Sequence, residues 1–195
     1  MFKVVEVDGV QITSHDGKVL ALTNYFRGVL GTPGNSTVMF DLQALYSGRA
    51  TASAAQSDKF TATEALTAVR SMNRCSAPGP DGFGTGFYAA AWQTIQSEVL
   101  AFLDGFHSED IDLQHINRSY MVLLPKKPGA VAVDCFRPIC LQNCSVKITA
   151  KILTTRLQRE IAELVALEQT GFVKGRSIAE NFVHAAELVQ VCHYR

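Results

Sequence analysis

The sequence has no long apolar run and few cysteines, and these shortages narrow the class of protein. No apolar stretch in its 195 residues approaches the ~18 residues of a membrane helix, so we expect no membrane partner. The first residues lack the layout of a secretory signal. The five cysteines are odd in number and scattered, which favours a reducing compartment over a disulfide framework. The sequence therefore predicts an intracellular protein of the nucleus or cytoplasm.

The sequence also lacks the spacings that mark common catalytic and metal sites. The cysteines between residues 135 and 144 form no Cys-x-x-Cys pair and have no suitably placed histidine pair, so zinc is not expected. The glycines at 82–86 follow no strand and are too closely spaced for a dinucleotide-binding loop. No two aspartates are adjacent, and the last aspartate is Asp134. We therefore predict no catalytic residue and no metal site in this chain.

A formal net charge of zero hides a marked asymmetry along the chain. Residues 1–117 hold seven Lys and Arg against twelve Asp and Glu, whereas residues 118–176 hold ten against four. The hydrophobic fraction of 47% and the charged fraction of 18% are those of a globular protein. A basic segment inside such a chain is typical of a surface that binds a polyanion.

Hydrophobic periodicity predicts an α+β fold that is mainly helical. A hairpin is expected over residues 4–12, turning at Asp8-Gly9, and two further strands over 120–124 and 136–141 should pair antiparallel. Capping boxes, which begin at Thr61 and Ser177, mark the starts of two helices. Five helices are expected, over residues 16–30, 61–75, 84–107, 145–166 and 177–195. Residues 31–58 are interpreted as a loose connector with one short ordered stretch near 40–46.

The helix expected at 145–166 has an apolar side and basic sides. We expect five apolar residues to point inward, namely Ile148, Ile152, Leu157, Ile161 and Leu164. The other faces carry four basic residues: Lys147, Lys151, Arg156 and Arg159.

Four short motifs occur in a characteristic order. They are Ala77-Pro78-Gly79-Pro80-Asp81-Gly82, Leu123-Leu124-Pro125-Lys126, Phe136-Arg137-Pro138-Ile139-Cys140-Leu141 and the stretch from Gln169 to Ser177. Together with residues 146–157, they resemble the fingers half of reverse transcriptases from non-LTR (LINE-type) retrotransposons. Residues 12–15 and 25–31 are similar to that family's segment between endonuclease and polymerase. The resemblance covers nearly the whole chain, and it implies a connector region at 1–58 followed by fingers and the start of an incomplete palm at 59–195.

The resemblance assigns nucleotide- and template-binding roles to residues of these motifs. The fingers lysine and arginine that contact triphosphate and template in the family correspond to Lys126 and Arg137 at the tip of the second hairpin. Four further residues are expected to lie along template and primer, namely Lys147, Lys151, Gly175 and Arg176. For the loop containing Gly175 and Arg176, a structural turn with a salt-bridged arginine is the alternative. Asp81 is expected to cap backbone amides of a rigid turn.

The family implied by these motifs is an RNA-directed DNA polymerase that uses two metal ions, held by aspartates in Phe-x-x-Asp-Phe and Tyr-x-Asp-Asp patterns. The sequence contains neither pattern. We therefore expect a fragment that is inactive alone and holds no cofactor, with Mg²⁺ belonging to the full-length enzyme. The expected partners are template RNA, an RNA–DNA hybrid and, in the full-length enzyme, an incoming dNTP.

Two alternatives remain open at this stage. One is a non-catalytic module that binds RNA or an RNA–DNA hybrid, and the other is an unrelated helical interaction protein. A further expectation concerns folding: the apolar faces of the helices at 145–166 and 177–195 should lack their packing partners.

Overall fold

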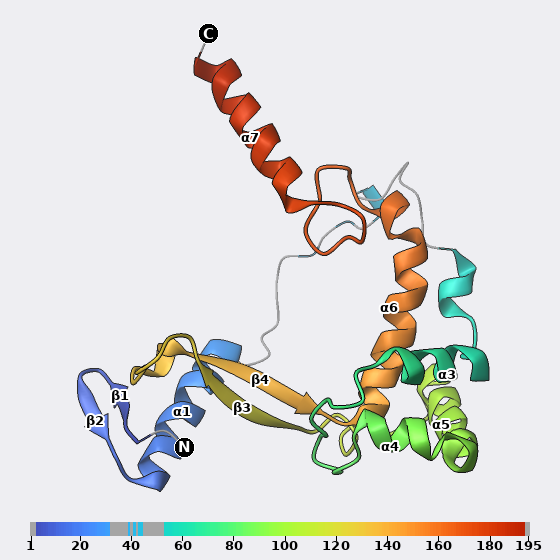
Figure 1. Ribbon diagram of the computed structural model, residues 1–195, viewed down its shortest axis with the longest axis horizontal. Coiled ribbons are helices and arrows are strands. Elements are labelled where there is room, and N and C mark those ends of the chain that lie inside the picture. Colours follow the sequence, from blue (N-terminus) through green and yellow to red (C-terminus); the bar gives the residue numbers. More distant parts are fainter. Residues whose placement is uncertain (1–2, 32–38, 40, 42, 45–52, 194–195) are drawn as a thin grey trace.

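A computed structural model describes residues 3–31, 39, 41, 43–44 and 53–193. This part of the chain is α+β, with six α-helices and two small antiparallel sheets (Figure 1). The elements are β1 (Val5–Val7), β2 (Val10–Ile12), α1 (His15–Leu30), the 3₁₀ helix η1 (Ala54–Ser57), α3 (Ala62–Ser71), α4 (Thr85–Ala90), α5 (Trp92–His107), β3 (Ser119–Pro125), the 3₁₀ helix η2 (Val133–Cys135), β4 (Phe136–Gln142), α6 (Cys144–Leu164) and α7 (Ile178–His193).

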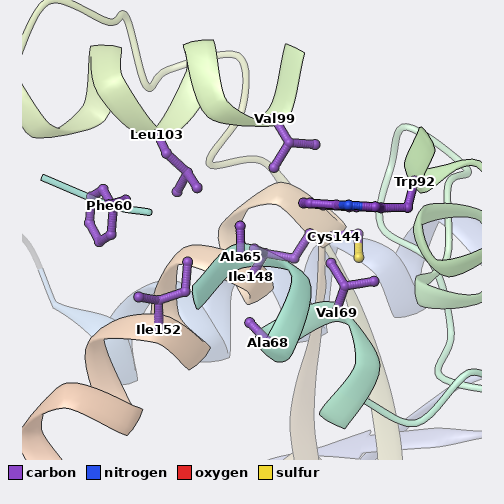
Figure 2. Close-up of a cluster of buried hydrophobic side chains, with 10 residues drawn as sticks. All are labelled: Phe60, Ala65, Ala68, Val69, Trp92, Val99, Leu103, Cys144, Ile148 and Ile152. Atoms are coloured by element: carbon purple, nitrogen blue, oxygen red, sulfur yellow. The ribbon is translucent and has the colours of Figure 1, made fainter. Parts of the chain in front are cut away.

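The hydrophobic core lies where α3 packs against α5 and the first half of α6 (Figure 2). We call α3, α4, α5 and α6 the helical unit. Leu103 of α5 and Ala65 of α3 are completely buried at its centre. The whole cluster comprises Phe60, Ala65, Ala68, Val69, Trp92, Val99, Leu103, Cys144, Ile148 and Ile152. Burial of this apolar area is the main stabilising term that these helices share.

The start of α3 is fixed by the capping box that the sequence predicts. The Thr61 hydroxyl accepts a hydrogen bond from the Glu64 amide at 3.2 Å, and the Glu64 carboxylate accepts one from the Thr61 amide at 3.0 Å. Two amides that no helical carbonyl could reach are thereby satisfied. The matching prediction at Ser177 is met only in part, because its hydroxyl accepts from the Ala179 amide at 3.3 Å, one residue short of the capping-box position.

The second hairpin, β3–β4, is long and mostly exposed to solvent. Its register runs from Ser119 opposite Gln142 to Pro125 opposite Phe136, as predicted for an antiparallel pair. Of its fourteen strand residues only Phe136 is buried. Figure 1 shows the hairpin as a bridge between the helical unit at its base and the N-terminal elements at its tip.

The N-terminal elements β1, β2 and α1 attach to the tip of that bridge. The Glu6 amide donates to the Val131 carbonyl at 2.7 Å, and Val5 of β1 is completely buried. Asp8 and Gly9 both have positive φ angles, 50° and 80°, as the predicted two-residue turn requires. The first hairpin and the following helix are therefore confirmed.

Several sequence predictions were wrong in detail. The helix expected over 84–107 is interrupted at Ala91, whose ψ of 6° is not helical, and Phe87 before the break is exposed. In α6 the apolar face is only partly covered: Ile148 and Ile152 are buried, but Leu157 is exposed. The expected lack of partners is therefore wrong for the first half of α6. It is confirmed for α7, in which no described residue is buried. The ordered stretch predicted near 40–46 lies mostly outside the described residues.

Candidate nucleic-acid interface

Lys126 and Arg137 lie together at the tip of the β3–β4 hairpin. Arg137 is paired across the strands with Leu124, and the Lys126 amide donates to the Cys135 carbonyl at 2.8 Å. Strand pairing puts Arg137 on the same face as Leu124, and Lys126 directly follows the last residue of β3. Both basic side chains are exposed, and the Lys126 ammonium donates to the Asp134 carbonyl at 2.7 Å. The tip region of the hairpin therefore carries two exposed cations.

Lys147 in the first turn of α6 holds the proline-rich turn at residues 77–82. Its ammonium donates to the Ala77 carbonyl at 2.8 Å. Gly79 packs so closely on Asn143 that a Cβ atom there would collide with it. Asp81 accepts from the Phe83 amide at 3.0 Å, so the predicted backbone cap is confirmed. The observed contacts of Lys147 are thus structural.

Asn143 is the buried residue that joins three segments at this point. Its side-chain oxygen accepts from the Asp81 amide at 3.2 Å, and its side-chain nitrogen donates to the Ile116 carbonyl at 3.0 Å. Because a buried amide with both ends satisfied is costly to displace, this residue fixes the base of the hairpin against the turn at 77–82. No feature of the sequence pattern singled it out.

Lys151 lies one helical turn beyond Lys147, and its side chain is exposed. It borders a groove between α3 and α6 with a volume of about 290 Å³. Residues four apart on a helix lie on the same face, so Lys147 and Lys151 belong to one basic stripe of α6.

Arg176 caps the C-terminal end of α6. Its guanidinium donates to four carbonyl groups at or just beyond the last turn, those of Ala162, Val165, Ala166 and Gln169. A positive charge at a helix C-terminus also interacts favourably with the helix dipole. Gly175 precedes it with a φ of 87°, a conformation that favours glycine. The loop is thus a turn held by its arginine, but among the described residues Arg176 is bonded to backbone carbonyls, whereas the structural alternative expected a salt bridge.

Arg156 was expected on a face of α6 other than the inward one, and this prediction was wrong. The side chain is buried at 6% exposure and is bonded to the Glu64 carboxylate, with its Nε atom 2.7 Å from Oε1. It also donates to the carbonyls of Gln56, Asp58 and Lys59, and it lies 4.8 Å from the centre of the Phe60 ring. Its five donors are thus used to join α6 to α3 and to the segment before α3.

The ion pair with Arg156 strongly lowers the pKa of Glu64. The hydrogen bond from Arg156 lowers the pKa of Glu64 to about 2, and the Thr61 contacts act in the same direction. Burial, by contrast, raises the pKa of the Cys144 thiol to about 11, so this cysteine is a neutral core residue at neutral pH.

The six predicted binding residues form separate groups rather than one pocket. Lys126 and Arg137 are at the hairpin tip, and Lys147 and Lys151 follow the hairpin base, seven strand residues or ~23 Å away. Gly175 and Arg176 lie beyond the far end of the 21-residue helix α6. Within the described ranges no group of three or more His, Cys, Asp or Glu side chains could hold a metal ion.

Comparison with known proteins relates the chain to retrotransposons. It is 31% identical over 122 residues to the transposon TX1 uncharacterized 149 kDa protein of Xenopus laevis, a match covering 62% of this chain and 9% of that protein. It is 26% identical over 115 residues to a retrovirus-related Pol polyprotein from the type-1 retrotransposable element R2 of Nasonia vitripennis, covering 58% of this chain and 11% of the polyprotein. No protein-family model matches.

The chain is therefore a retrotransposon-related protein. It spans about a tenth of the length of these two relatives. No helix in the described part of the chain is both long enough and apolar enough to cross a membrane.

Proposed function

We propose that this chain is the fingers portion of a retrotransposon reverse transcriptase, with a connector at residues 1–58 and fingers and the start of a palm at 59–195. Its task is to hold the template RNA, or an RNA–DNA hybrid, and the incoming nucleotide. Similarity to a retrovirus-related Pol polyprotein over 115 residues is the observation that carries the proposal. The order of the four motifs supports the same reading.

The hairpin tip is the part of the interface that we assign to phosphate groups. Lys126 and Arg137 are both exposed near the tip of the hairpin, and both template and nucleotide are polyanions. Arg137 suits bidentate contact with phosphate oxygens, whereas Lys126 acts as a compact point charge. Lys147, Lys151 and the Gly175–Arg176 loop extend the basic surface along α6, with Lys147 and Arg176 also holding the fold.

We assign no nucleotidyl-transfer step to these residues. Metal-dependent phosphoryl transfer needs carboxylates that hold metal ions near the reacting phosphate. The chain has no pair of adjacent aspartates, and its one acidic cluster, Glu109-Asp110-Asp112, lies in a polar segment after α5. We expect no nucleotide incorporation by this chain alone with Mg²⁺ or Mn²⁺, and incorporation by pure protein in a primer-extension assay would contradict that expectation.

The binding role is tested by fluorescence anisotropy with a labelled single-stranded RNA and a labelled RNA–DNA hybrid over a range of salt concentrations. The double variant Lys126→Gln/Arg137→Gln should bind about tenfold more weakly at low salt. Its slope of log K against log salt should be smaller by ~1.4 for the single strand, because two phosphate contacts are lost.

A matched control removes two positive charges from the segments that flank α3, at the other end of the hairpin, where Lys59 and Arg74 are exposed. The Lys59→Gln/Arg74→Gln variant should bind as the unaltered chain does. Equal losses in the two variants would assign the effect to net charge, and salt-independent binding would contradict a phosphate interface altogether.

A further inference from the structure

The groove between α3 and α6 is walled by two side-chain ladders with different chemistry. On α3 the ladder consists of hydroxyl groups at every fourth residue, Thr63, Thr67 and Ser71. On α6 it consists of Lys151, Thr155 and Arg159, also at every fourth residue. Residues with this spacing lie on one face of a helix, so each wall keeps its chemistry for two turns.

The floor of the groove is closed and electrically neutral. Ala68 and Ile152 are buried beneath it, at 4% and 2% exposure. Glu64 also borders it, but its carboxylate is bonded to the guanidinium of Arg156 and to Thr61. The two remaining charges on the walls, Lys151 and Arg159, are both positive and both exposed.

The hydroxyl wall offers hydrogen-bond donors to a ligand. Ser71 donates to the Ala68 carbonyl and Thr155 to the Lys151 carbonyl, each at 2.8 Å, so these two hydroxyls are already used. The hydroxyls of Thr63 and Thr67 make no hydrogen bond to any residue in the described part of the chain. The groove thus combines two cations with two available donors, which is a set that matches the oxygens of phosphate groups.

The dimensions suit a short stretch of nucleic-acid backbone. Lys151 and Arg159 are eight residues apart, which is ~12 Å along the helix axis. Phosphates recur every ~3.4 Å along the axis of a stacked strand, so the two cations can face phosphates about three nucleotides apart. The volume of about 290 Å³ is at the lower limit for pockets that enclose a small molecule, which favours a chain lying along the groove.

We propose that the groove between α3 and α6 is a second RNA-backbone site, in which Lys151 and Arg159 contact phosphates and Thr63 and Thr67 donate to their oxygens. This inference rests on the proposed function and extends it from the hairpin tip to the outer face of the helical unit. It adds Arg159, Thr63 and Thr67 to the binding residues and gives Lys151 a defined place. The contacts are with the backbone, so binding should not depend on base sequence.

The test uses the full chain and a fluorescein-labelled oligouridine RNA, in anisotropy titrations from low to moderate salt. Lys151→Gln/Arg159→Gln should weaken binding about tenfold and lower the salt slope by ~1.4. Lys151→Arg/Arg159→Lys, which keeps both charges, should bind normally. Thr63→Val/Thr67→Val should weaken binding by roughly threefold per hydroxyl while leaving the salt slope unchanged.

The outcomes separate the groove from the wider proposal. If the unaltered chain binds RNA and the groove variants bind equally well, the groove proposal is overturned and the proposed function stands. If the unaltered chain binds no RNA at low salt, the proposed function fails and the groove proposal fails with it. Equal competition by poly-glutamate of matched charge would overturn the assignment to RNA. Circular-dichroism melting curves identify any variant that is unfolded. If the Gln variant is unfolded, the binding of Lys151→Arg/Arg159→Lys tests the groove proposal, and weakened binding by this folded, charge-preserving variant would contradict it.

Discussion

The helical unit and helix α7 both carry apolar residues at helical spacing, but only the helical unit buries them. In the helical unit, Val69, Leu103, Ile148 and Ile152 lie in one core at 2% exposure or less. In α7, Phe182 and Leu188 are 71% and 66% exposed, and no described residue is buried. Figure 1 shows α7 projecting away from the rest of the chain. The comparison teaches that helical periodicity alone does not create a core, because a facing element must supply the other half of the contact.

The largest expected effect comes from breaking the buried ion pair that holds the helical unit together. Arg156→Ala should lower the free energy of unfolding by about 4 kcal/mol, because it leaves the Glu64 carboxylate and three carbonyls without their donor. Arg159→Ala, three residues further along α6 at an exposed position, should change it by less than about 0.5 kcal/mol. Urea denaturation followed by circular dichroism measures the free energy of unfolding of both variants. Similar losses in the two variants would contradict a structural role for Arg156.

A second prediction compares the same substitution in the two regions. Leu103→Ala should lower the free energy of unfolding by about 3 kcal/mol, because the completely buried side chain leaves a cavity. Leu188→Ala in α7 should change it by less than about 0.5 kcal/mol, because that side chain is exposed. A large loss from Leu188→Ala in the same denaturation experiment would show that α7 is packed in solution, against a second copy or elsewhere.

The third prediction concerns pH and has a smaller effect. The pKa of Glu64 is about 2 in the folded chain, below its ordinary value of 4.5, so the carboxylate binds fewer protons folded than unfolded. The contribution of this carboxylate to the free energy of unfolding, about 2 to 3 kcal/mol, should be complete above pH 4.5. It should be lost as the pH falls towards 2. The stability difference between the unaltered chain and Glu64→Gln, measured from pH 6 downwards, should therefore shrink across that window. A difference that stays constant would contradict the pKa.

The sequence predicted most of the local structure because local structure has local causes. The Asp8-Gly9 turn and the Thr61–Glu64 capping box depend on neighbours within a few residues. The strands predicted at 120–124 and 136–141 are also short local patterns, and the structure extends them to 119–125 and 136–142. The break at Ala91 was missed because no proline or glycine marks it and helical periodicity continues across that position.

The candidate site was predictable as a list of residues but not as an arrangement. Motif order identified Lys126 and Arg137, and the pairing of β3 with β4 brings their positions to one end of the hairpin. Helical periodicity put Arg156 on a face other than the inward one, and only the position of Glu64 on α3 reveals its burial. The groove is a further case, because its hydroxyl wall is 80 or more positions away from its basic wall in the sequence.

The contacts of Asn143 fix the base of the β3–β4 hairpin, about which the hairpin can rotate. Both ends of the hairpin base are bound there, since Asn143 directly follows β4 and bonds to Ile116 just before β3. The tip, with Lys126 and Arg137, extends ~23 Å from that point. A rotation of the hairpin by about 5° about its base would therefore move these cations by about 2 Å, enough to make or break a contact with a phosphate oxygen. Precision at the tip is thus set by a buried amide at the opposite end of the hairpin.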